Sequence, residues 1–134
     1  MKYFAVIDTN VIVSALIKHN SIPGKVIDFV TTGEITLLGN FDILDEYEDV
    51  LTRSKFSFAE EEVHNYLCML REKMVIIDSQ KCEESFIDLE DVKFYEVTIS
   101  FKEDQAYLVT GNKKHFPEKA FIVSPNEMVE IIEN

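Results

Sequence analysis

Short apolar runs alternate along the chain with longer segments in which apolar positions recur every three or four residues. The run at 3–7 is continuously apolar and rich in β-formers, which predicts a strand buried on both faces. Similar runs predict strands at 35–38, 75–77, 106–110 and 121–123. Because helical patterns separate these runs, we expect an α/β sandwich with a central parallel sheet.

Helix boundaries carry their own signals. Gly33 is placed to end a helix, and the sequence Ser124-Pro125-Asn126-Glu127 matches a capping box with proline at the first helical position. The Pro-Gly pair at 23–24 indicates a break before the helix that Gly33 ends. Helices are predicted to start at residue 9 or 10 and to cover 25–32, a segment around 43–51, 59–74, 92–100 and 125–132.

Composition bounds the class of protein. The 134 residues, 46% of them hydrophobic, fit one globular domain over residues 1–134. No apolar run reaches the roughly 20 residues that span a bilayer, and the amino terminus passes directly into the first strand, so we expect neither membrane association nor a signal peptide. Cys68 lies in the apolar stripe of the 59–74 helix, which predicts a buried thiol, and Cys82 is distant from it. These features favour the cytoplasm.

Charge narrows the possible partners. The chain has 25 acidic residues against 13 lysines and arginines, a formal net charge of −12. Proteins that bind nucleic-acid duplexes non-specifically rely on a basic face, so such binding is not expected. The acids either form a solvated surface or, in part, converge on divalent cations.

Asp8 is the first candidate for a functional residue. It follows the first strand directly, and ligands of open α/β folds bind beyond the carboxyl ends of the strands. A buried carboxylate there requires a partner or a metal. Taken alone, Glu46 on the third helix is more typical of a surface residue, and the acids at 88–91 are more typical of a helix N-terminus. Asp88 and Asp104 are interpreted as loop or capping residues.

Four motifs, in order, resemble the PIN-domain ribonucleases. They are Asp8-Thr9-Asn10 with the apolar residues that follow, Glu46-Tyr47 with Val50-Leu51 and Arg53-x-Lys55-Phe56, Asp91 three residues before Phe94, and Leu108-Val109-Thr110-Gly111-Asn112. The resemblance extends from Tyr3 to about Ile132. The stretch 108–117 is similar to a prokaryotic group classed as toxin components of toxin–antitoxin pairs.

This resemblance implies a three-layer α/β/α sandwich, with acids at the carboxyl edge of the sheet that hold one or two Mg²⁺ or Mn²⁺ ions. The matching positions assign catalytic and metal-binding roles to Asp8, Glu46 and Asp91. Asn112 stands where many of these nucleases carry an aspartate. It keeps an oxygen ligand but loses a charge, so a second ion is expected to bind weakly.

Other polar residues take supporting roles under the same resemblance. Asn10 is expected to orient Asp8, while Ser14 and Thr110 are polar neighbours at the same edge. Lys113 and Lys114 are expected to contact RNA phosphates. His115 is a candidate general base, but we interpret it instead as part of a surface loop. The implied function is metal-dependent hydrolysis of single-stranded or structured RNA by a toxin. A cognate antitoxin and a homodimer are the protein partners left open.

Three alternatives compete with this interpretation. A dehalogenase-type phosphotransferase needs a second aspartate two residues after Asp8, where the chain has Asn10. A P-loop or dinucleotide fold needs a glycine-rich turn after the first strand, and none is present. A PIN-fold protein-binding module with weak or no catalysis remains the main alternative, favoured by the acidity and by Asn112.

Overall fold

A five-stranded sheet organises the computed structural model, which describes residues 2–134. All neighbouring strands pair in parallel, with β1 at the centre and the spatial order β3-β2-β1-β4-β5. The carboxyl ends of the strands therefore meet at one edge of the sheet. The parallel sheet predicted from the sequence is confirmed. The strands are β1 (Tyr3–Ile7), β2 (Ile35–Gly39), β3 (Val75–Ile76), β4 (Ala106–Val109) and β5 (Ile122–Val123).

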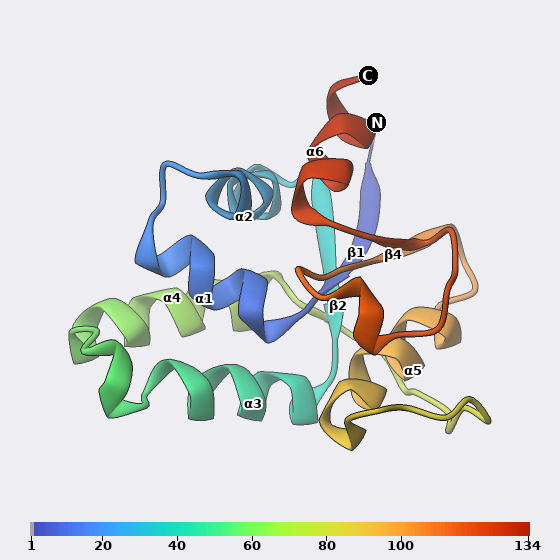
Figure 1. The fold of residues 1–134 in the computed structure, drawn as a ribbon. Coiled ribbons are helices and arrows are strands. Elements are labelled where there is room, and N and C mark those ends of the chain that lie inside the picture. The colour runs from blue at the N-terminus through green and yellow to red at the C-terminus, as the bar shows by residue number, and fades with distance from the viewer. Residues whose placement is uncertain (1) are drawn as a thin grey trace.

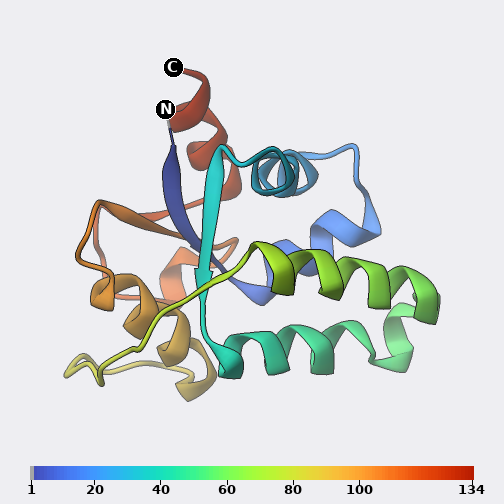
Figure 2. The ribbon, with the colours of Figure 1, turned by 180° about the vertical axis from the view of Figure 1, so that it is seen from behind.

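Helices cover both faces of the sheet (Figures 1 and 2). Helix α5 packs against β1, β2 and β4 on one face, and α2 packs against β2 from the other face, beside α1 and α6. This is the three-layer α/β/α sandwich that the resemblance implied. The helices are α1 (Thr9–Ile17), α2 (Ile22–Thr32), α3 (Phe41–Leu51), α4 (Glu60–Lys73), α5 (Val92–Ser100) and α6 (Pro125–Glu133). None of these helices is long and apolar enough to cross a bilayer.

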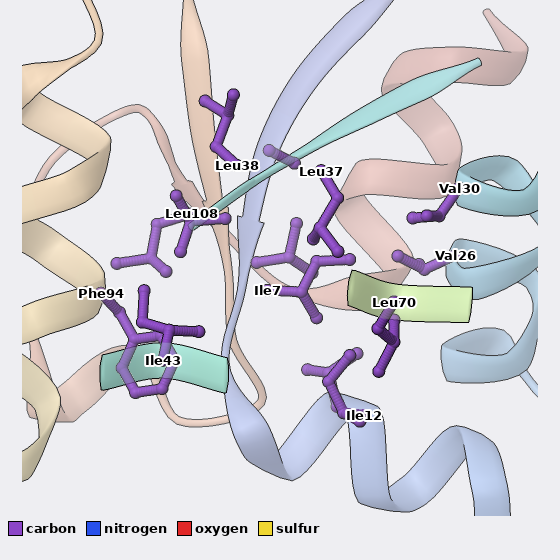
Figure 3. Close-up of a cluster of buried hydrophobic side chains, with 14 of the residues drawn as sticks. Ile7, Ile12, Val26, Val30, Leu37, Leu38, Ile43, Leu70, Phe94 and Leu108 are labelled. Carbon is purple, nitrogen blue, oxygen red and sulfur yellow. The ribbon is translucent and has the colours of Figure 1, made fainter. Parts of the chain in front are cut away.

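The core lies on both sides of the central strands, as Figure 3 shows. On β2, Leu37 points toward α2, whereas its neighbour Leu38 points to the side of Phe94 on α5. Successive side chains of a strand alternate between faces, so a strand covered by helices on both faces is apolar at consecutive positions. The continuous apolar run of β1 has the same cause, since Ala5, Val6 and Ile7 are fully buried.

The amino terminus of α6 is a complete capping box, as predicted. The Ser124 hydroxyl accepts a hydrogen bond from the Glu127 amide at 3.1 Å, and the Glu127 carboxylate accepts one from the Ser124 amide at 2.8 Å. Gly33 ends α2 with a φ of +86°, a conformation that glycine adopts without strain.

Helix α2 begins earlier than predicted. It starts at Ile22, because the Ser21 hydroxyl caps it by accepting a hydrogen bond from the Gly24 amide at 3.1 Å. The Pro-Gly pair at 23–24 therefore lies inside the first turn instead of preceding the helix, and proline is tolerated there because the first amides of a helix have no intrahelical partner. A Cβ at Gly24 would lie 1.7 Å from the His19 carbonyl oxygen, so the close approach requires glycine.

The prediction of a buried thiol at Cys68 is wrong. Helix α4 turns Val63, Leu67 and Leu70 toward the core, and Cys68, one position after Leu67, is exposed. Its sulfur lies 3.6 Å from His64 Nε2. The buried stripe of α4 is narrower than its sequence pattern indicated.

Candidate active site

Asp8 joins the central strand to the first helix. Its amide donates a hydrogen bond to the Val109 carbonyl at 2.9 Å, which extends the pairing of β1 with β4 by one residue. Its own carbonyl accepts the amide of Val11 at 3.0 Å and so opens α1. The side chain is thus fixed at the carboxyl edge of the sheet, where the residue is only 5% exposed.

Thr110 orients the Asp8 carboxylate. The Thr110 hydroxyl donates to Asp8 Oδ2 at 2.8 Å and accepts the Asn112 amide at 3.0 Å. The Thr110 amide donates to the Val123 carbonyl at 2.9 Å, which anchors this residue between β4 and β5. Thr110 is fully buried, so this hydrogen bond is shielded from water. The expected role of Thr110 as a polar neighbour of Asp8 agrees with this contact.

The surroundings of Asp8 disfavour its charged form. Burial raises the pKa of the carboxyl group, the Thr110 hydroxyl lowers it, the charge of Glu46 raises it, and the backbone amides of Thr9 and Asn10 lower it. The net result is a raised pKa. A cation bound beside Asp8 would offset both burial and repulsion.

Glu46 lies at the same edge, on α3. The next residue, Tyr47, is fully buried and donates a hydrogen bond to the Ile7 carbonyl at 2.5 Å, which holds α3 against the end of β1. Glu46 Oε2 accepts a hydrogen bond from the Thr9 hydroxyl, and Oε1 lies 2.5 Å from Lys93 Nζ. Burial lowers the pKa of Lys93, but hydrogen bonds and charges from Glu46 and Glu90 outweigh it, and the net pKa is raised. Lys93 is therefore a stable cation beside the acids.

Asp91 ends the short turn Leu89–Asp91 immediately before α5. Burial, together with the charges of Asp8 and Asp88, raises its pKa to about 6, against the lowering effect of His115. His115 Nδ1 lies 3.3 Å from Asp91 Oδ2, but the alignment does not make a hydrogen bond, and within residues 2–134 this buried oxygen has no hydrogen-bond partner. A buried oxygen without a donor is a place that a cation can occupy.

The acids influence one another but do not form a complete set of metal ligands. The charge of Glu46 acts on Asp8, and that of Asp8 acts on Asp91, so the three acids are electrostatically coupled through Asp8. Across residues 2–134, however, no three His, Cys, Asp or Glu side chains are disposed to hold a metal ion. Both oxygens of Glu46 contact protein groups, which leaves Asp8 and Asp91 as the carboxylates best able to bind a hard divalent cation.

A model of the PIN domain family matches residues 5–114. This range contains all the acids described above. The chain belongs to the PIN domain family. It is also similar to the uncharacterized protein MJ1680 of Methanocaldococcus jannaschii, with 32% identity over 116 residues, which cover 84% of this chain and 73% of that protein. PIN domains are generally nucleases, so phosphodiester hydrolysis is the general chemistry of the family to which this chain belongs.

The remaining expected site residues of this PIN domain differ in their placement. Asn10 and Ser14 are exposed on α1, and no side-chain hydrogen bond joins either to Asp8 in the described part of the chain. The Asn112 side chain is half-buried. Asp88 and Asp104 accept hydrogen bonds from the amides of Glu90 and Gln105, at 2.9 Å and 2.7 Å, in agreement with their interpretation as capping and loop residues.

Lysines line a hollow of about 630 Å³ that is formed by residues of the segment 113–127, which follows β4 in the chain. Lys113 pairs with Glu127 at 2.9 Å on its rim, and Lys114 is exposed. Lys119 also lines the hollow, whose apolar lining includes Phe116 and Pro117. The predicted RNA-contacting lysines thus lie in the loop that begins at Asn112.

Sequence reasoning missed one residue at this candidate site and set another aside. Lys93 contacts Glu46 from another helix, and no local pattern indicates that contact. His115 was interpreted as a surface residue, yet it approaches Asp91 while its side chain stays 38% exposed. The signal for His115 was available, since it follows β4 by a few residues and the carboxyl ends of parallel strands share one edge.

Proposed function

We propose that this PIN domain is a divalent-metal-dependent endoribonuclease that hydrolyses phosphodiester bonds in single-stranded or structured RNA. The observation that carries the proposal is the pair of carboxyl groups at the sheet edge, Asp8 and Asp91. Both have raised pKa values, and the charge of Asp8 contributes to the rise at Asp91, whose buried Oδ2 lacks a hydrogen-bond donor within residues 2–134. Carboxylates in this condition favour a bound cation.

The chemistry of the donors selects the kind of cation. Carboxylate oxygens of Asp8 and Asp91 and the amide oxygen of Asn112 suit Mg²⁺ or Mn²⁺, which retain several waters when bound by a few protein ligands. Bound at this edge, such an ion supplies the positive charge that activates water and offsets charge developing on the phosphate. Glu46 adds a third acid beside Asp8.

The chain's own residues prepare the site. Thr110 holds the Asp8 carboxylate in one orientation through its hydroxyl. Lys113 and Lys114 lie in the loop after Asn112 and bind backbone phosphates of the substrate. The net charge of −12 leaves few cations for the regular phosphate array of a duplex, which favours flexible single strands and loops.

We also propose that the protein acts in the cytoplasm as the toxin of a prokaryotic toxin–antitoxin pair. The similarity of residues 108–117 to that group of PIN proteins supports this role. A cognate antitoxin is then the expected protein partner, and self-association into a homodimer is the second. If expression of the chain slows bacterial growth, Asp8→Asn should remove the effect, and an antitoxin encoded beside it should relieve it.

A protein-binding module is the second candidate. Asn112 and the Lys93 ammonium both reduce the negative charge available for cations, which favours weak catalysis. Full-length protein that binds a partner but cleaves no RNA in Mn²⁺ or Mg²⁺ would support this alternative.

The direct test incubates purified protein with structured and unstructured RNAs in Mn²⁺, Mg²⁺ or chelator. We expect cleavage with either metal and none with chelator. Asp8→Asn is the matched variant, because it keeps the side-chain shape and removes the charge. Cleavage by Asp8→Asn at the wild-type rate would refute the site, and faster cutting of double-stranded DNA would refute the RNA preference.

A further inference from the structure

Lys93 lies inside the acid cluster. Its ammonium nitrogen is 2.5 Å from Glu46 Oε1, 3.2 Å from Glu90 Oε2 and 2.8 Å from the Glu90 carbonyl oxygen. The side chain is only 18% exposed, and its nitrogen lies 5.2 Å from the centroid of the Phe94 ring. A long lysine side chain held this closely differs from the mobile ion pairs of a protein surface.

Both oxygens of the Glu46 carboxylate contact protein groups. Oε1 contacts Lys93, and Oε2 accepts the Thr9 hydroxyl. The pair is well matched in exposure, at 19% for Glu46 and 18% for Lys93. A divalent ion at Glu46 would have to share an oxygen with one of these two partners and would lie beside the Lys93 ammonium, which repels it.

The opposite holds for Asp91. Within residues 2–134 its buried Oδ2 makes no hydrogen bond, and its ion-pair partner there is His115 Nδ1 at 3.3 Å. Asp8 has one side-chain donor, Thr110. The free coordination capacity of the cluster is therefore on the side of Asp8 and Asp91, and the lysine occupies the side of Glu46.

We propose that the Lys93 ammonium takes the place of a second metal ion, so that Asp8 and Asp91 bind a single divalent cation while Glu46 positions Lys93. Asp8, Glu46, Asp91 and the Lys93 ammonium together carry a formal charge of −2, which one divalent ion neutralises. Glu90, the other acid that pairs with Lys93, is 78% exposed, so water screens its charge. Asn112 acts in the same direction, because it supplies an oxygen without a charge. This inference rests on the proposed metal-dependent function and specifies its metal count.

Calorimetric titration of the metal-free protein with Mn²⁺ measures how many ions each chain binds. We expect one ion per chain for the wild type and for Lys93→Arg, which keeps the charge. Lys93→Met removes the charge at similar length and frees Glu46 Oε1, so the count should rise to two. Lys25→Met is the matched control, because it makes the same change in net charge at a lysine that pairs with Glu133, 2.5 Å away in another ion pair. Its count should stay at one.

A second variant covers the case in which Lys93→Met does not fold. Glu46→Gln should keep the count at one and change the affinity of that ion by less than tenfold, because Glu46 is engaged by Lys93. Two ions in the wild type, one ion in folded Lys93→Met, or a loss of more than a hundredfold in Glu46→Gln would each overturn the inference. A wild type that binds no divalent ion would instead refute the proposed metal-dependent function itself.

Discussion

At the scale of single residues, the buried hydroxyl of Thr110 joins two parts of the site. It donates to Asp8 and accepts from the amide of Asn112, so one side chain fixes both the first acid and the loop after β4. A buried polar group that loses its partner is destabilised by about 1–3 kcal/mol, which makes this position sensitive to substitution.

Thr110→Val should lower the free energy of unfolding by about 1–3 kcal/mol, since it keeps the shape but leaves Asp8 Oδ2 and the Asn112 amide without partners. Urea unfolding measures this change. Thr52→Val is the control, because the Thr52 hydroxyl is exposed and bonds only within its own helix; its effect should stay within about 0.5 kcal/mol. Equal effects at both positions would contradict the buried hydrogen bond.

Asp91→Asn should stabilise the metal-free protein, increasingly so as the pH rises from about 4 to 7. The pKa of Asp91 is raised from 3.8 to about 6 in the folded state, so the folded protein holds this proton more tightly than the unfolded chain does. Stability from this group is therefore present at low pH and is lost as the pH rises between the two values. Asparagine cannot ionise, so Asp91→Asn avoids this loss of unfolding free energy. We expect the loss to be on the order of 1 kcal/mol, since Asp91 is partly exposed.

Chemical denaturation across this pH range, in chelator, checks the prediction. Repeating it with saturating Mn²⁺ is the control, because the wild type should then be the more stable form through metal binding. A gain in chelator that does not change with pH would mean that burial and the neighbouring acids do not raise the pKa of Asp91 in the folded protein.

Asn112→Asp should tighten divalent binding and lower the melting temperature of the metal-free protein. The added carboxylate joins acids that already repel one another, and a cation relieves that repulsion. Mn²⁺ titration and melting in chelator measure the two effects. If neither quantity changes, Asn112 does not face the site, and the resemblance is misaligned in its last third.

At the scale of elements, features of the fold that depend on residues adjacent in sequence were predictable. Features that depend on how the elements pack were not. Continuous apolar runs identified the strands, although β3 at the edge of the sheet is exposed, and the capping box identified the start of α6. The same local signals failed at Pro23-Gly24, because a proline in a first helical turn and a proline in a break look alike in sequence. Cys68 failed because only packing decides how wide the buried stripe of α4 is.

The residues of the candidate site also differ in whether the sequence alone could indicate them. Asp8 could be predicted because a charged residue after a buried strand is costly without a partner, and Glu46 and Asp91 came from the family resemblance rather than from their own surroundings. Lys93 could not be predicted, since its contact with Glu46 joins elements that are far apart along the chain. His115 could have been, because it follows β4 by a few residues.

Gly24→Ala should destabilise the protein by about 1–3 kcal/mol through overpacking at the start of α2. The added Cβ would lie 1.7 Å from the His19 carbonyl oxygen, a backbone atom that cannot move away freely. Gly111→Ala is the matched control, because a Cβ there meets nothing within 4 Å. Thermal or urea unfolding compares the two, and an equally stable Gly24→Ala would contradict the close approach.

At the scale of the whole molecule, positive charge is scarce and its placement is informative. The net charge is −12, yet three lysines line one hollow. The residues that line it belong to the chain segment after β4, which begins near Asn112. Lys113 shares its charge with Glu127, whereas Lys114 is exposed. Because Asn112 begins the loop that carries Lys113 and Lys114, we expect an RNA strand bound at the acids to contact these two lysines.

Lys113→Gln with Lys114→Gln should therefore weaken RNA binding and reduce its salt dependence, by a slope of about 0.7 for each phosphate of a single strand that the protein no longer neutralises. Lys114→Gln alone should have the larger single effect, because Lys113 must first leave Glu127 to meet a phosphate. Binding measured in Ca²⁺ or with Asp8→Asn, over a range of salt, separates affinity from cleavage. Lys25→Gln with Lys73→Gln, on α2 and α4, makes the same change in net charge and should leave the slope unchanged. Equal slopes for both double variants would mean that RNA approaches the acids over a different face.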